Sequence, residues 1–261
     1  MTRYVQAVVV VGCCLLWWPA AARAATVRRL FEPTDMELED PGVVELDMQF
    51  GVVRGQDAYR VSAPDFELDL GLTSNVEFDV DGEFAIAGPN TGAFSFDHVS
   101  PDNLWTSVKL GLLDFADVDA DVAWTVGMQV GPEFPVANSA QGVGIEGLLL
   151  FGWRFHQTQL VLNLGGLVDP GGGGDAPRPS GPEYGIDLAQ GLDAAGHWSL
   201  SGEISGVTYT SPDPDQFTTT VGITWSPSDN LDLSVVGLRG WLSGGDQYGV
   251  LFGVSPKFRL W

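Results

Sequence analysis

The sequence predicts an all-β fold, a closed antiparallel up-and-down transmembrane β-barrel of about twelve strands. Three observations support this prediction. Short segments of alternating apolar and polar residues follow a leader peptide, the connections between them alternate between short and long, and the chain ends on Trp261. Because successive side chains of a strand point to opposite faces, one row can contact lipid while the other contacts a wet interior.

Residues 1–24 have the pattern of an export signal. A basic residue near the start precedes an apolar stretch over 5–18 and an Ala-Arg-Ala cleavage site at 22–24. The alternative is a lipoprotein signal processed at Cys13. Cys13 and Cys14 are the only cysteines, so cleavage after residue 24 leaves no thiol and excludes disulfides and cysteine metal sites.

Length and charge limit the remaining possibilities. A chain of 261 residues suits a single all-β domain. The leader carries two basic residues and no acidic one, so its removal leaves ten basic against 34 acidic residues, a net charge of −24. A surface this acidic repels nucleic acid, so no nucleic-acid partner is expected.

The mature chain divides into an N-terminal segment and a series of strands. Residues 25–42 are charged, contain two prolines and are expected to lie on the periplasmic side, either disordered or inside the lumen. The barrel is expected over 43–261. Twelve strands are predicted at 43–53, 65–73, 76–87, 104–113, 120–131, 142–153, 159–168, 183–191, 197–210, 216–225, 231–242 and 247–260.

The segment from Phe66 to Val80 shows the alternation most plainly. Apolar residues hold its even positions, and mostly acidic residues hold its odd positions. Most predicted strands have the 9 to 12 residues that a tilted strand needs to cross the hydrocarbon. The connections at 74–75, 114–119, 154–158, 192–196 and 226–230 are short and read as periplasmic turns, whereas most of the others are longer, as expected of outer loops.

The odd-position acids are the candidate lumen-lining residues. Crowded carboxylates favour cations, so a cation preference is expected if the pore conducts; the alternative is that these acids only solvate the lumen face. Lys109 is the basic residue placed among them, with an ion pair expected near Asp79 or Asp81. The acids are Glu45, Asp47, Glu67, Asp69, Glu77, Asp79, Asp81, Asp121, Glu146, Glu183, Asp187, Glu203 and Asp232.

Aromatic residues are predicted to form two girdles at the membrane interfaces, where Trp and Tyr are favoured. The girdle near the periplasmic ends comprises Trp153, Trp198, Trp225 and Trp261, and the girdle near the outer ends comprises Tyr184, Phe217, Trp241 and Tyr248.

Three alternatives stay open at this stage. The same period also suits a secreted soluble β-sandwich or lipocalin-like barrel with its apolar rows inside. A barrel could be structural or adhesive and bind a partner through its outer loops. An outer-membrane hydrolase would depend on His98, His156 or His197, yet no nucleophile motif accompanies them. We therefore predict no catalytic, cofactor or metal site and no enzyme.

Four stretches carry a family resemblance. These are Phe66 to Val80, Leu104 to Gly111, the run Gly131-Pro132-Glu133-Phe134-Pro135, and the last hairpin from Gly244 to Trp261. Together they resemble the meta-pathway phenol-degradation family of outer-membrane proteins. The resemblance implies an outer-membrane barrel sometimes associated with uptake of hydrophobic or aromatic compounds, and it carries over no functional residues.

The sequence therefore favours a porin-like passive channel or transporter for small solutes in a Gram-negative outer membrane, with both termini periplasmic. The expected partners are outer-membrane lipid, lipopolysaccharide and the barrel-assembly machinery. The C-terminal insertion signal departs from its usual pattern, because Lys257 and Arg259 occupy positions that normally carry apolar residues.

Overall fold

The computed structural model describes residues 36–55, 59–87, 99–101, 103–117, 119–136, 142–170, 178–210 and 213–261. The predicted leader, residues 25–35 and His98 lie outside these ranges. Within them, no helix is long and apolar enough to cross a membrane.

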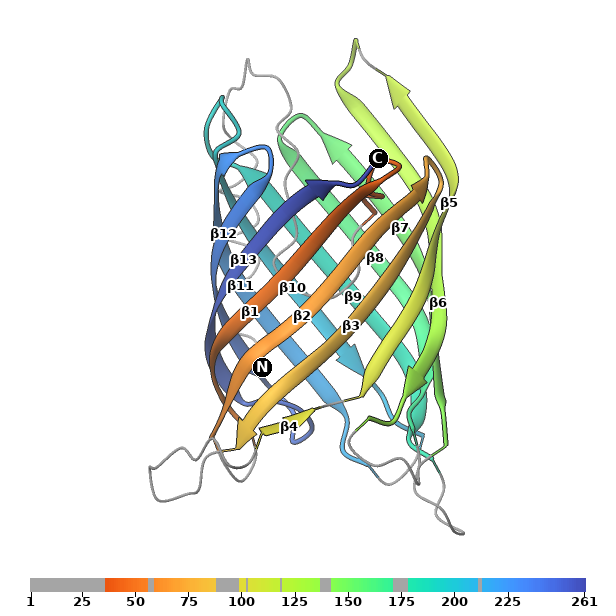
Figure 1. The fold of residues 1–261 in the computed structure, drawn as a ribbon, viewed down its shortest axis with the longest axis vertical. Helices are drawn as coiled ribbons and strands as arrows, with labels where there is room; N and C mark the ends of the chain where they lie inside the picture. The colour runs from red at the N-terminus through yellow and green to blue at the C-terminus, as the bar shows by residue number, and fades with distance from the viewer. Residues whose placement is uncertain are drawn as a thin grey trace, which may run out of the picture.

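Strands account for most of the described chain (Figure 1). They are β1 (Val43–Arg54), β2 (Tyr59–Thr73), β3 (Val76–Ala87), β4 (Val99–Pro101), β5 (Leu104–Asp117), β6 (Val122–Phe134), β7 (Gly144–Phe155), β8 (Thr158–Val168), β9 (Ser180–Gly191), β10 (Trp198–Val207), β11 (Gln216–Ser228), β12 (Leu231–Gly240) and β13 (Tyr248–Arg259).

Twelve long strands form one closed antiparallel barrel, which confirms the predicted fold class. Each long strand pairs with its neighbours in the chain, β3 pairs with β5, and the sheet closes because β1 pairs with β13. Because the sheet is closed, the backbone donors and acceptors of every long strand have partners on both sides of the strand. An open sheet in lipid could not provide these partners at its edges.

All twelve predicted strands are present, and their bounds differ at two places by more than three residues. β2 begins at Tyr59 rather than residue 65, and β5 continues to Asp117 rather than ending at residue 113. Both extensions pass through β-bulges, between Ser62 and Asp65 and between Gly111 and Leu113, which interrupt the apolar and polar alternation. The short strand β4 was not predicted, because three residues pairing at the edge of β3 leave no periodicity to detect.

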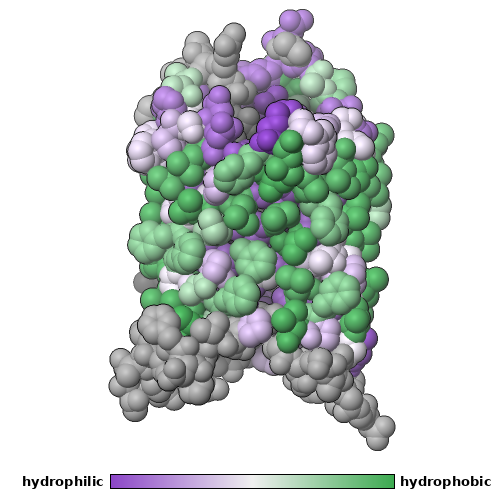
Figure 2. Space-filling model, in the orientation of Figure 1, coloured by the Kyte–Doolittle hydropathy of each residue, from purple (hydrophilic) through white to green (hydrophobic). Residues whose placement is uncertain are grey.

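The apolar rows face outward. Leu149 and Leu164 are opposed across β7 and β8, and their side chains are 60% and 62% exposed on the outer surface. Figure 2 shows the resulting hydrophobic band across the middle of the visible face of the barrel, with hydrophilic residues above it. The alternating acids and amides are buried on the inside, among them Glu77, Asp79 and Gln129. This arrangement excludes the soluble alternative, in which apolar rows would pack together within the core.

The two ends of the barrel differ. The turn end, at the top of Figure 1, is where β2 is followed by β3, β5 by β6, β7 by β8, β9 by β10 and β11 by β12, and it carries the start of β1 and Trp261. At the loop end β1 is followed by β2, β3 by β5, β6 by β7, β8 by β9, β10 by β11 and β12 by β13, mostly after more residues. The predicted alternation of short and long connections is therefore present for most pairs.

The predicted girdle residues lie toward these two ends. At the turn end, Trp198 stacks on Trp225 with ring centroids 5.9 Å apart, and Trp153 stacks on Phe155. Trp261 follows the end of β13 and is exposed. The loop end holds the other four residues, Tyr184 near the start of β9, Phe217 near the start of β11, Trp241 directly after β12, and Tyr248 at the start of β13.

The outward orientation of Leu164 leads to a stability prediction. Leu164 lies near the middle of β8, so Leu164→Arg should lower the free energy of unfolding from a bilayer by about 2–4 kcal/mol. Leu192→Arg, in a turn at the turn end, should cost about 0–1 kcal/mol. Urea unfolding in lipid vesicles measures both. Equal losses would contradict a membrane-spanning band.

Candidate functional site: the acidic lumen

Carboxylates face one another across the inner wall formed by β1, β2 and β3. The antiparallel register opposes Asp47 to Glu67, Glu45 to Asp69, Asp69 to Asp79 and Glu67 to Asp81. Like charges directly opposite on neighbouring strands destabilise a sheet. The stability of this wall therefore depends on positively charged groups and hydrogen-bond donors close to the carboxylates.

A buried polar layer on β3, β5 and β6 supplies part of that compensation. Lys109 Nζ lies 2.9 Å from Glu77 Oε1, its register partner, and both side chains are almost completely buried. Asp79 Oδ2 accepts hydrogen bonds of 2.9 Å from Ser107 Oγ and from Gln129 Nε2. The expectation of an ion pair near Asp79 or Asp81 is corrected, because the register places Lys109 opposite Glu77, two residues before Asp79 on β3, and the ion pair forms there.

The N-terminal residues 36–41 lie against this layer inside the turn end. Met36 packs in an apolar cluster with Trp105, Leu148, Leu150 and Val161 on the inner face. The backbone N–H of Glu39 donates a hydrogen bond to the Glu77 carboxylate. Of the two positions foreseen for this segment, the described part adopts the one inside the lumen.

Inward-facing glycines make room for this segment. A Cβ added at Gly152 would lie 2.7 Å from Met36 Cγ, and one at Gly111 would lie 3.0 Å from Leu38 Cδ1. At Gly71 the added atom would meet the backbone carbonyl oxygens of Glu39 and Asp40. Larger residues at these positions would exclude the segment from its present place.

A cavity of about 560 Å³ occupies the loop half of the lumen. Its wall is mostly polar and includes Asp47, Glu67, Asp81, Glu133, Glu146 and Glu183. A second cavity of about 330 Å³ lies at the turn end, lined by Glu39, Lys257 and their neighbours. The buried layer and the N-terminal segment lie between the two, among the residues that the structure describes.

The rim of the loop end carries its own charge contacts. Arg60 Nη2 lies 2.8 Å from Asp246 Oδ2 and 3.3 Å from Glu83 Oε2. Burial raises the pKa of Asp246 above its ordinary value, and the Arg60 guanidinium opposes that rise. Burial also raises the pKa of Tyr209, whose hydroxyl donates a hydrogen bond to Asp169 Oδ2 at 3.3 Å.

The remaining predicted acids are distributed around the barrel. Glu146 and Glu183 line the large cavity, and Asp187 and Glu203 are buried register partners on β9 and β10. Asp232 is buried on β12. Asp121 departs from the prediction, because it lies in the turn before β6 with a left-handed φ of 51° and contacts His156 Nδ1 at 3.1 Å.

The two described histidines, His156 and His197, lie apart from the large cavity. His156 pairs with Asp121, and His197 lies 3.7 Å from Asp193, each in a turn at the turn end. None of the described residues that line the large cavity is a histidine. The geometry therefore gives no support to a hydrolase built on these two residues.

Sequence reasoning missed two important lumen residues. Lys257 contacts Glu39 and lies 2.8 Å from Glu45, its register partner across the β1–β13 closure. Lys257 stands at an odd position of β13, like the inward-facing Leu251 and Gly253. The alternation along this strand could therefore have predicted that Lys257 faces the lumen. Gln129 is completely buried opposite Lys109, and its neutral side chain gave no reason to single it out.

Comparison with known proteins supports the fold. The sequence matches no protein-family model, and no curated protein sequence matches it. An outer-membrane channel from Pseudomonas putida F1 superimposes with a TM-score of 0.61 at 10% identity, over 88% of this chain and 100% of that chain. This chain has the fold of an outer-membrane β-barrel. The KdgM porin superimposes with a TM-score of 0.50 at 11% identity, over 83% of this chain and 99% of that one.

The buried Lys109–Glu77 pair leads to a second prediction. Lys109→Met leaves Glu77 without its ammonium partner in a buried setting, which should lower the free energy of unfolding by about 3–5 kcal/mol. The double variant Lys109→Met, Glu77→Gln should recover much of that loss. Urea unfolding in detergent micelles measures each variant.

The matched control is Arg259→Met. The ion pair of Arg259 with Asp40 is largely exposed, so its removal should change stability by less than about 1 kcal/mol. If Lys109→Met were as mild as this control, the buried pair would not stabilise the layer.

Proposed function

We propose that this chain is a passive outer-membrane channel for small solutes, with the turn end and both mature termini on the periplasmic side. One observation carries the proposal: a closed barrel with an apolar exterior encloses a cavity of about 560 Å³ lined mainly by polar groups. An apolar exterior suits lipid, and a polar interior suits dissolved solutes. The two solved channels with this fold support the same role.

The lumen charge favours cations. Six acidic side chains of the cavity wall stand on six different strands; they are Asp47, Glu67, Asp81, Glu133, Glu146 and Glu183. Carboxylates distributed around a confined aqueous space attract cations and repel anions. The proposed channel therefore passes cations more readily than anions of equal size.

The proposed solutes are small molecules, and they include the hydrophobic or aromatic compounds that the family resemblance implies. Phe66 and Trp105 lie on the cavity wall among the acids and offer such compounds an apolar contact. A weakly basic aromatic solute would use both features of this wall.

A non-conducting barrel is the second candidate. Glu77 is 1% exposed, Asp79 2% and Gln129 0%, so the layer between the two cavities leaves little free space around these side chains. A structural barrel, or one that binds a partner through its outer loops, would need no path through this layer. Conductance across planar bilayers separates the candidates, because a silent barrel would overturn the channel.

The cavity acids yield a selectivity prediction. Replacing Asp81 by Asn and Glu133, Glu146 and Glu183 by Gln should lower the permeability of cations relative to anions, because four carboxylates leave the wall. Reversal potentials in a salt gradient measure this ratio.

The control variant removes the same number of charges outside the cavity. Asp114, Asp117, Asp119 and Asp193 lie at the turn end outside both cavities, and their replacement by Asn should leave the reversal potential nearly unchanged. A cavity variant that behaves like this control would show that ions do not pass along the acidic wall.

The N-terminal segment yields a conductance prediction. Replacing residues 36–40 by Gly and Ser removes the side chains that pack against Trp105 and pair with Lys257. Single-channel conductance should rise because the turn half of the lumen widens. Met36→Leu keeps the volume of the side chain and should leave conductance close to that of the native chain. Equal conductance in all three proteins would contradict an obstructing segment.

A further inference from the structure

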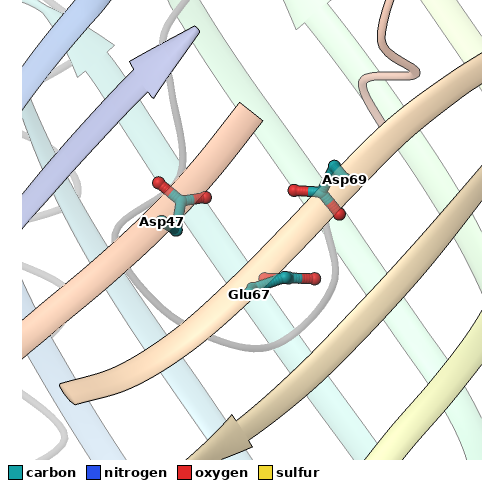
Figure 3. Close-up of side chains that lie close together, drawn as sticks. All are labelled: Asp47, Glu67 and Asp69. Atoms are coloured by element: carbon teal, nitrogen blue, oxygen red, sulfur yellow. The ribbon is translucent and has the colours of Figure 1, made fainter. Parts of the chain in front are cut away.

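Three carboxylates converge on the inner wall beside the large cavity. Asp47 extends from β1, and Glu67 and Asp69 extend from β2 (Figure 3). One carboxylate oxygen from each residue lies within 4.8 Å of the others. The register opposes Asp47 directly to Glu67, so the backbone pairing itself holds the group together.

Asp69 provides an independent observation that points to a ligand. Its side chain is only 7% exposed, and its Oδ1 atom has no hydrogen-bond partner. A buried carboxylate oxygen without a partner is costly, because the group loses its hydration and gains nothing in return. Asp69 also belongs to a second close group with Glu77 and Asp79.

Among the described residues, the hydrogen-bond donors near Asp69 lie on one side of it. Lys109 pairs with Glu77, and the amide of Gln129 and the hydroxyl of Ser107 donate to Asp79. These donors lie on the β3 and β5 side of Asp69. The opposite side of Asp69, toward β1, is where Asp47 and Glu67 add two further carboxylates.

We propose that Asp47, Glu67 and Asp69 bind a divalent cation of the calcium type within the lumen. Calcium takes six to eight oxygen ligands at about 2.3–2.6 Å, so two of its ligands lie up to roughly 5 Å apart, which accommodates the observed spacing. Magnesium, at about 2.0–2.1 Å, requires a tighter set of ligands. Water supplies the remaining ligands from the cavity that Asp47 and Glu67 line.

The bound cation neutralises opposed carboxylates on β1 and β2, beside the β1–β13 closure. The ladder of this closure is interrupted between Glu45 and Met48, opposite Pro256, which has no backbone N–H. An ion held by both strands at Asp47 and Glu67 therefore stabilises the barrel close to this interruption. This inference does not depend on the proposed channel function, since a non-conducting barrel would bind the ion equally.

Calcium binding to the purified full barrel in detergent micelles tests the proposal. After chelator treatment, isothermal titration with CaCl₂ should show one site in the native chain. Asp69→Asn and, separately, Glu67→Gln should weaken that binding by at least roughly 10-fold, because each removes a ligand and even the loss of a group that supports a ligand typically costs this much. Asp187→Asn removes a buried lumen carboxylate from the distant strand β9 and should leave the affinity unchanged.

The same titrations contain the results that would overturn the site. Absence of a calcium site in the native chain would mean that protons neutralise these acids. Equal weakening in Asp187→Asn would mean that calcium responds only to the net charge of the lumen. If Asp69→Asn does not fold, Glu67→Gln together with the stoichiometry of the native chain decides the question. Conductance is measured separately, so failure of this site leaves the channel proposal intact.

Discussion

Closure of the backbone ladder is the constraint on which the rest of this structure depends. Once β1 pairs with β13, every long strand has a neighbour on both sides, and the side chains can face only outward or inward. The outward rows are apolar, so the chain's many acids collect on the inside. The acidic lumen is therefore a direct consequence of the alternation along each strand rather than of any single motif.

Two lysines among the described residues form ion pairs with the acids of the inner wall. Lys109 and Lys257 lie on opposite sides of the β1–β2–β3 wall, and each binds the carboxylate opposite it in register. Between them the wall keeps several directly opposed carboxylates. Directly opposed like charges are unfavourable in a sheet, and departures of this kind from local rules are typical of functional positions in proteins.

The strands could be predicted from the sequence because period-two alternation is a strong signal, and it located all twelve long strands. The errors occurred where that signal stops. Bulges hid the full lengths of β2 and β5, and Asp121 follows the inward parity of β6 but lies in the turn before it. Spatial neighbours were harder to predict, because the partner of Lys109 depends on a register that the sequence does not reveal. The close packing of Met36 on Trp105 depends on a segment with no strand pattern at all.

The inward glycines make room for the N-terminal segment. They thereby separate the number of strands from the width of the open lumen, two properties that usually change together in barrels. Strand number fixes the diameter of the wall. In this barrel, however, Gly71, Gly111, Gly127 and Gly152 admit a stretch of the chain's own backbone into the space that the wall encloses. The width of the open lumen therefore depends on which residues occupy the inner surface. Changes at these four positions alone would alter the size of molecule that a barrel of the same twelve strands admits.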